Sequence, residues 1–86
     1  MAQPSLSEAK LAELMDLLEQ RIEVIGDARL RESRPKEHLE KLQDVSEAIK
    51  AFHERHRDSM HPRLDHFLEN ASFGKALDWA RAEREK

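Results

Sequence analysis

The sequence predicts an all-α protein. Among its 86 residues there is no Thr, Tyr or Cys, there are only two Gly, and Val and Ile together number five, so residues that favour strands are scarce. The apolar residues recur at intervals of three and four, which is typical of amphipathic helices. We expect one domain over residues 1–86, an antiparallel hairpin of two long helices followed by two short C-terminal helices, of helical-bundle type and completed by dimerisation.

The first long helix is predicted over residues 6–30. Ser5 and Glu8 have the spacing of a capping box, in which each side chain satisfies a backbone N–H at the helix start. The apolar arc of this helix is wide, roughly half of its circumference, so we expect it to contact more than one neighbour. Its main stripe consists of Leu11, Leu14, Leu18, Ile22 and Ile25. Gly26 can kink or end the helix, and the sequence does not define at which residue between Ile25 and Glu32 the helix ends.

The second long helix is predicted over residues 35–58. Pro35 suits the first turn of a helix, where its missing N–H costs nothing. The apolar stripe is narrower here and consists of Leu39, Leu42, Val45, Ile49 and Phe52. Two helices of ~25 residues, each near ~37 Å long and joined by a short turn, favour an antiparallel hairpin.

Two short helices are predicted over residues 62–70 and 73–85. Pro62 fits the start of the first, and Ser72 can serve as the N-cap of the second. The apolar face changes sides around Asn70–Ala71–Ser72, which indicates a break there and not one continuous helix. The pattern leaves open whether these helices pack on the hairpin.

Composition excludes several classes of function. The chain has no Cys, so thiolate catalysis and disulfide frameworks are excluded. Its net charge is −3, and 38% of its residues are charged. No basic stripe suited to phosphates is present, and we expect no binding of nucleic acid. No apolar run approaches the ~20 residues that span a bilayer, and the first ten residues lack a signal-peptide pattern. We therefore expect a cytoplasmic protein that makes no contact with membranes.

Five histidines are the most unusual feature, and all of them lie between residues 38 and 66. His53 and His56 are three positions apart on a helix, and a turn at Pro62 can bring His61 near them. One hypothesis is that His53, His56 and His61 bind zinc or another divalent metal. A second is that partly buried imidazoles repel one another once protonated, so that the protein responds to pH. Because no HExxH motif accompanies them, we expect ordinary polar helix residues and no cofactor.

Nothing in the sequence predicts an enzyme. Ser59 lies near His56 and Asp58, but no glycine-rich loop is present to stabilise an oxyanion. We therefore expect a non-enzymatic interaction protein, an adaptor or a small regulatory protein. Its partner would be a second copy, giving a homodimer, or another protein.

The wide apolar face of the first helix is the predicted association surface, because one narrow helix and a short C-terminal segment cannot readily cover it. The residues expected to take part in association are Leu11, Leu14, Leu18, Ile22 and Ile25 of this face, together with Trp79 of the last helix. The length and acidity are similar to those of colicin immunity proteins, and the hairpin resembles that of secretion chaperones. These resemblances imply binding of a protein partner, but the defining motifs of both families are missing.

Overall fold

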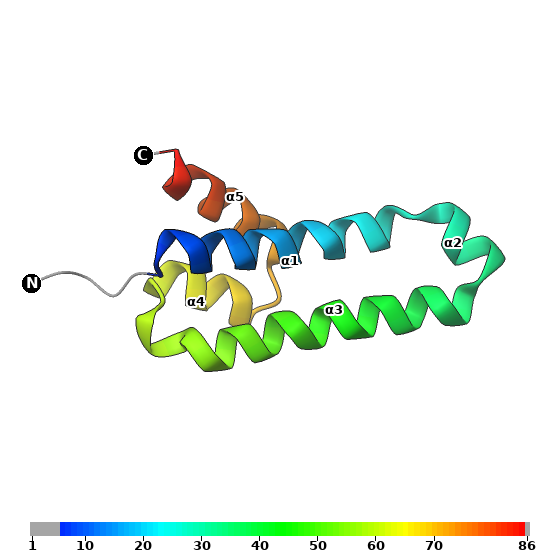
Figure 1. The fold of residues 1–86 in the computed structure, drawn as a ribbon, viewed down its shortest axis with the longest axis horizontal. Coiled ribbons are helices and arrows are strands. Elements are labelled where there is room, and N and C mark those ends of the chain that lie inside the picture. Colours follow the sequence, from blue (N-terminus) through cyan, green and yellow to red (C-terminus); the bar gives the residue numbers. More distant parts are fainter. Residues whose placement is uncertain (1–5, 86) are drawn as a thin grey trace, which may run out of the picture.

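The computed structural model describes residues 6–85, and within that range the chain is all-α without strands (Figure 1). The prediction of the fold class is therefore confirmed. Five α-helices and one turn of 3-10 helix follow one another along the chain. They are α1 (Glu8–Gly26), α2 (Ala28–Ser33), α3 (Pro35–His56), η1 (Arg57–Ser59), α4 (Pro62–Glu69) and α5 (Phe73–Arg84).

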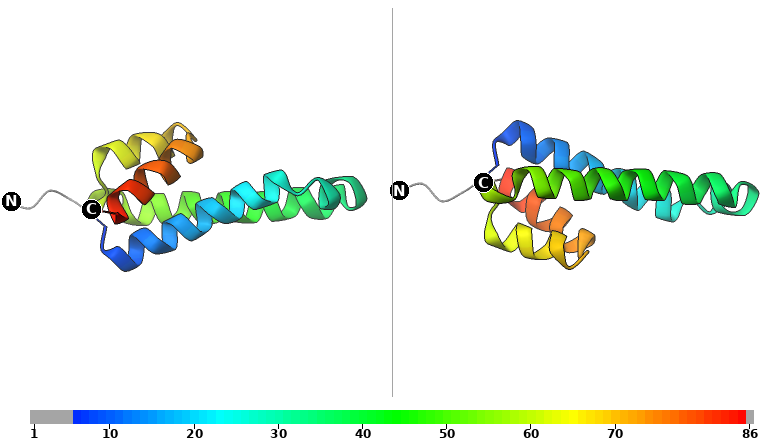
Figure 2. Two further views of the ribbon diagram at one scale, coloured as in Figure 1. Left: turned by 90° about the horizontal axis from the view of Figure 1, so that it is seen from above. Right: turned by 90° about the horizontal axis from the view of Figure 1, so that it is seen from below.

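The long helices form an antiparallel hairpin with α2 at its tip, and the molecule measures 52 × 24 × 21 Å. The short helices α4 and α5 contact each other, and they pack on α3 and α1 respectively. Both lie at the end where α1 begins and α3 ends, while the rest of the hairpin projects beyond them (Figure 2). We call the projecting part, residues 22–42, the arm. The C-terminal helices thus fold back on the hairpin.

Helix α1 begins two residues later than the sequence pattern predicts. Ser7 is its N-cap, and the Ser7 hydroxyl accepts a hydrogen bond from the backbone N–H of Lys10 at 3.2 Å. Such a bond satisfies one of the N–H groups that a helix start leaves unpaired. The predicted cap, Ser5, lies outside the described residues.

The predicted first helix, residues 6–30, is divided in two after Gly26, the residue at which the sequence allows a kink or an end. Helix α1 ends at Gly26, and Asp27 takes a non-helical conformation with φ −83° and ψ 80°. The Asp27 carboxylate accepts a hydrogen bond from the backbone N–H of Leu30 at 3.0 Å, which caps the short helix α2. Aspartate is among the strongest N-cap residues, so it ends one helix and starts the next.

The predicted break between the two C-terminal helices is confirmed. Ala71 has a φ of 56°, a left-handed conformation that reverses the chain after α4. Ser72 occupies the N-cap position of α5, although its hydroxyl makes no capping hydrogen bond. The Ser72 backbone N–H instead donates to the carbonyl of Phe67 at 2.8 Å.

The hydrophobic core lies at the covered end of the hairpin, where α1, α3, α4 and α5 meet. Five large side chains there are fully buried: Leu14, Leu18, Ile49, Leu64 and Leu77. The small residues Ala76 and Ala80 are also buried, which lets α5 approach its neighbours closely. The arm consists of the end of α1, all of α2 and the start of α3.

Candidate functional site

One apolar stripe of α1 is buried at its start and exposed at its end. Residues seven apart lie almost two full turns apart and so share one helix face, as do Met15 and Ile22, and Leu18 and Ile25. Leu18 is 0% exposed, whereas Ile22 is 46% and Ile25 is 41% exposed. The face that α1 buries in the core therefore continues onto the arm, where the chain leaves it open.

The cover over this stripe ends near Arg21. The Arg21 guanidinium carbon lies 4.5 Å from the ring centre of Phe73, the first residue of α5. Further along α5, Arg81 pairs with Glu19 at 3.5 Å. Because α5 starts at Phe73 and runs back toward the start of α1, it cannot reach the positions beyond Arg21.

Helix α3 adds a third exposed apolar residue, Leu39, which is 54% exposed. Leu39, Ser46 and His53 follow one another at intervals of seven, so they share one face of α3. Ser46 and His53 line a groove with Phe73, the first residue of α5. Leu39 therefore points to the side of the hairpin on which the C-terminal helices lie.

A hydrogen bond sets the register of the arm. The Nε2–H of His38 donates to the carbonyl oxygen of Val24 at 2.7 Å, and His38 is buried. In an antiparallel pair this contact places Leu39 at the level of the last turns of α1, which carry Ile22 and Ile25. We call these three residues, Ile22, Ile25 and Leu39, the bare face.

The structure separates the predicted association residues. Leu14 and Leu18 are 0% exposed and lie in the chain's own core, so they are not available to a partner of the folded protein. Leu11 and Trp79 are half-buried, and both line a hollow with residues from the start of α1 and the end of α5, away from the arm. Only Ile22 and Ile25 are left exposed on the predicted stripe.

Leu39 was missing from the predicted set because it was assigned to the buried stripe of α3. Its helical position is about 120° away from Val45, which lies at the centre of that stripe. This angle places Leu39 at the margin of the stripe. The angular position of Leu39 is therefore the feature of the sequence that indicates its exposure.

His53 joins α3 to α4 through a network of charged groups. It is 8% exposed, and its Nε2–H donates to a carboxylate oxygen of Asp65 at 2.5 Å. Arg57 contacts Asp65 at 3.2 Å and Glu69 at 2.9 Å. The hydrogen bond from His53 and the positive charge of Arg57 together hold the pKa of Asp65 below its usual value. The network holds the two helices together where η1 turns the chain.

The three histidines of the predicted metal site make separate contacts. His56 stacks on Phe52 with ring centres 4.5 Å apart. The Nδ1 of His61 accepts a hydrogen bond from the backbone N–H of Arg63, which caps α4. Within residues 6–85 no three His, Asp or Glu side chains are placed to hold a metal ion together. The structure thus does not bring His53, His56 and His61 together as ligands.

The geometry around His53 also differs from the one that the pH hypothesis assumed. A carboxylate, and not another imidazole, faces the ring. The response of the protein to pH stays a prediction.

Comparisons of the chain with models of protein families, with curated proteins and with solved structures found no match. None of the helices described here combines the length and the apolar character needed to cross a membrane. The helices of residues 6–85 form an all-α helical bundle.

Proposed function

We propose that this chain is a non-enzymatic helical interaction protein that self-associates through the bare face of its arm. The observation that carries the proposal is the exposure of Ile22, Ile25 and Leu39 on one side of the hairpin, at one level. Their side chains continue the face that α4 and α5 cover elsewhere. Contiguous exposed apolar residues of this kind mark sites of protein interaction.

A second copy is a suitable occupant because it brings an equivalent pair of helices. Two arms that meet face to face form a four-helix arrangement, in which the apolar sides of the helices are buried in a shared core. A twofold axis through the contact would place the bare face of one copy against the bare face of the other.

The patch is small, so we expect weak association. Complete burial of an Ile or Leu side chain contributes about 1.5–3 kcal/mol, and these three residues are already about half covered. Much of this free energy is offset by the translational and rotational entropy that two molecules lose on association. We therefore expect dissociation constants on the order of micromolar or weaker.

The test measures molar mass by sedimentation or light scattering from low to high micromolar concentration. We expect the wild-type mass to rise with concentration, and Ile22→Glu or Leu39→Glu to abolish the rise because each places a charge in the contact. Ala51→Glu adds the same charge at an exposed position of α3, outside the bare face, and should dimerise like the wild type. Circular dichroism verifies that each variant keeps its helices.

Two results would contradict the proposal. One is a wild-type protein that stays monomeric at high micromolar concentration and does not bind a dye specific for exposed apolar surface. The other is self-association that survives both glutamate substitutions in the bare face.

A further inference from the structure

The C-terminal helices form a layer that covers one side of the hairpin along part of its length. Helices α4 and α5 contact each other at the end where α1 begins, and the arm projects beyond them (Figure 2). Helix α4 runs toward the arm and α5 runs back, so the turn between them, residues 70–72, faces the arm. Since the bare face lies on the same side of the hairpin, a step separates it from this turn.

A hollow of about 420 Å³ lies at the base of this step, and we call it the corner. Its lining includes Ser46 and Lys50 of α3, Leu68 and Glu69 of α4, and Phe73 of α5. The corner therefore borders both the hairpin and the edge of the α4–α5 layer. A molecule that lies along the bare face would meet the corner with its leading end.

The step determines how two copies can meet through their bare faces. Packed helices lie about 8–10 Å apart, so the helices of two arms have to approach to this distance. A helix with its side chains is about 10–12 Å thick, and two parallel hairpins would therefore touch through their α4–α5 layers first, with the arms ~30 Å apart. In an antiparallel pair each arm lies beyond the layer of the other copy, so the arms can touch.

The position of the bare face fits this antiparallel arrangement. The twofold axis of such a pair passes midway between the step and the tip of the arm. On α1 the step lies near Arg21, which contacts Phe73, and the tip begins with α2 at Ala28. Ile22 and Ile25 lie between these two points, so an axis through the bare face brings each tip to the step of the other copy.

The charges of the tip also suit the corner. Arg29 and Arg31 of α2 are exposed, and neither forms an ion pair with another side chain of residues 6–85. At the corner two carboxylates, those of Asp65 and Glu69, share the single guanidinium of Arg57. A further arginine would find an acceptor there.

From these observations we infer that two copies pair antiparallel, with the α2 tip of each seated in the corner of the other. This geometry rests on the proposed self-association and specifies how it occurs. Each copy contributes Arg29 and Arg31 to a site whose remaining walls are α3, α4 and α5 of the other copy.

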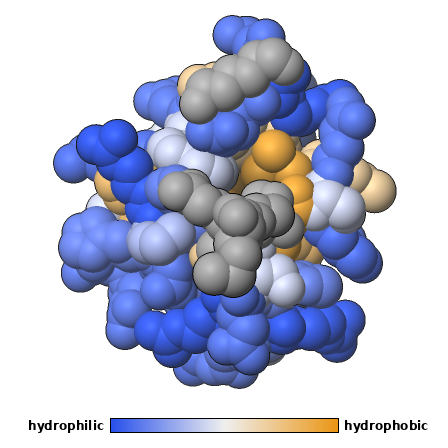
Figure 3. All heavy atoms as spheres, turned by 90° about the vertical axis from the view of Figure 1, so that its left-hand side faces the viewer, coloured by the Kyte–Doolittle hydropathy of each residue, from blue (hydrophilic) through white to orange (hydrophobic). Residues whose placement is uncertain are grey.

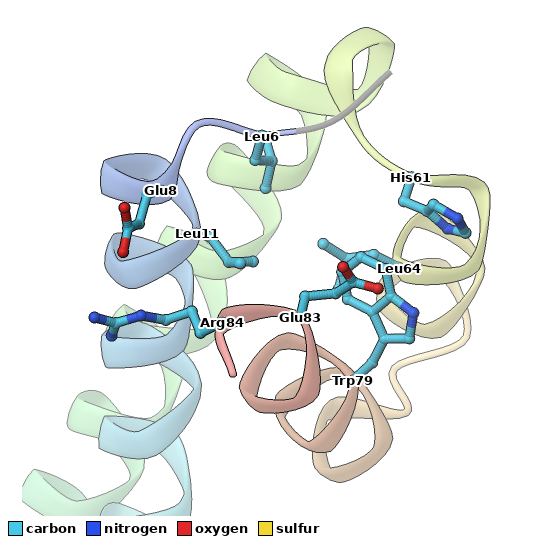
Figure 4. A pocket seen from close by; sticks show the side chains of 8 residues that line it. All are labelled: Leu6, Glu8, Leu11, His61, Leu64, Trp79, Glu83 and Arg84. Atoms are coloured by element: carbon cyan, nitrogen blue, oxygen red, sulfur yellow. The ribbon is translucent and has the colours of Figure 1, made fainter. Parts of the chain in front are cut away.

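Apolar surface is also present at the end opposite the arm. Seen from that end, it gathers in one patch with hydrophilic residues around it (Figure 3). A hollow of about 370 Å³ lies at this end, and Leu6, Leu11 and Trp79 are among the residues that line it (Figure 4). Pairing through this end would bring the two η1 turns together, whereas the antiparallel pairing of arms places them at opposite ends of the dimer.

Distances between spin labels distinguish these arrangements, because the chain has no Cys and one substitution labels one position. We would label Asp58→Cys in η1 and Glu32→Cys in α2, both exposed, and measure distances by double electron–electron resonance at high micromolar concentration. At about 1.5 Å per residue from an axis near Leu39, the labels should lie ~60 Å apart at position 58 and ~25 Å apart at position 32.

Mixed samples locate the tip. Equal amounts of Glu32→Cys and Glu47→Cys, an exposed position beside the corner, should give a distance of ~20 Å between copies, against ~30 Å for Glu32→Cys with Asp58→Cys. Labels at position 58 closer than ~35 Å would overturn the antiparallel geometry, since three helix spacings or an end-to-end contact give such values. A distance from position 32 to 47 that is no shorter than that from 32 to 58 would overturn the contact of the tip with the corner.

A charge variant with a matched control tests the same contact. The double substitution Arg29→Gln and Arg31→Gln should weaken dimerisation about fivefold, as expected for the loss of two exposed ion pairs. Arg55→Gln with Arg63→Gln removes the same charge from exposed positions outside the arm and should dimerise like the wild type. Equal dissociation constants for the two double variants would contradict the role of the tip.

The molar mass of the unlabelled wild type separates this inference from the proposed function. A mass that rises with concentration, together with short distances at position 58, would overturn the antiparallel geometry alone. A mass that stays monomeric would overturn the self-association and this geometry with it.

Discussion

At the scale of single residues, the two buried histidines bind neighbouring helices together. His38 donates to the carbonyl of Val24 near the end of α1, and His53 donates to the carboxylate of Asp65 on α4. Each imidazole has an apolar body that packs between helices and a polar edge that a neighbouring helix satisfies. Histidine suits these positions because it fills space without leaving a buried donor unpaired.

The hydrogen bond between His53 and Asp65 predicts a specific dependence of stability on acid. Because folding lowers the pKa of Asp65, its ionised form stabilises the fold above the unfolded pKa of about 3.9. This stabilisation is lost as the pH falls through the lower pKa of the folded protein. We expect Asp65→Asn to reduce the free energy of unfolding at neutral pH by about 1–2 kcal/mol.

Urea unfolding between neutral pH and about pH 3 checks this prediction. Asp65→Asn should lose less stability than the wild type over that range, since its side chain has no proton to take up. Asp44→Asn, an equal change of charge at an exposed position of α3, should keep the wild-type dependence. An identical acid dependence for wild type and Asp65→Asn would show that the contact with His53 contributes nothing.

At the scale of elements, the chain reversal between α4 and α5 includes a residue in an unfavourable conformation. Ala71 has a φ of 56°, and this left-handed region costs an L-residue about 1 kcal/mol that glycine does not lose. We expect Ala71→Gly to stabilise the protein by up to about 1 kcal/mol, less the entropy that glycine adds to the unfolded chain.

Thermal unfolding measures the effect of this substitution. Ala82→Gly is the matched control, because it makes the same chemical change at an exposed position inside α5. In a helix, glycine is about 1 kcal/mol less favourable than alanine, so this control should melt at a lower temperature. Two variants that shift the melting temperature in the same direction would contradict the conformational argument.

The sequence predicts the helices well because their apolar residues are periodic, but periodicity alone does not show what covers a face. The spacing of Leu18, Ile22 and Ile25 is regular along α1, although α5 covers Leu18 and does not cover Ile22 or Ile25. The limit of this cover depends on how α5 packs on α1, which is a tertiary contact. The hydrogen bond from Leu30 to Asp27 also interrupts the helix without disturbing the apolar pattern.

The histidine cluster shows a second reason why spacing is insufficient. His53 and His56 lie three apart on one helix, yet their rings have different neighbours, Asp65 on α4 and Phe52 on the same helix. Their spacing on α3 predicts that the two side chains are close together. It does not predict which neighbouring group each imidazole ring contacts.

At the scale of the whole molecule, residues 6–85 form an end in which four helices share a core and an arm made of the end of α1, α2 and the start of α3. Local stability follows the amount of buried apolar contact, so the arm should open more often than the core. We expect amide hydrogens of residues 22–42 to exchange with solvent faster than those of α1 around Leu14 and of α3 around Ile49. Hydrogen-exchange mass spectrometry at low micromolar concentration measures both regions.

The same experiment at high micromolar concentration adds information about association. If arms pair, exchange in residues 22–42 should become slower while the core stays unchanged. Ile22→Glu should remove this dependence on concentration. Uniform exchange along the hairpin would contradict the division into core and arm.

The described chain starts and finishes at the same end of the hairpin, since α1 begins and α5 ends opposite the tip at α2 (Figure 1). A carrier fused near the start of α1 or near the end of α5 would therefore be attached at the end of the molecule opposite α2. Fusion to a carrier or attachment to a solid support at either position would hold the protein by its core and present the arm outward. A surface coated with the protein in this way would expose Ile22, Ile25 and Leu39 to the surrounding solution.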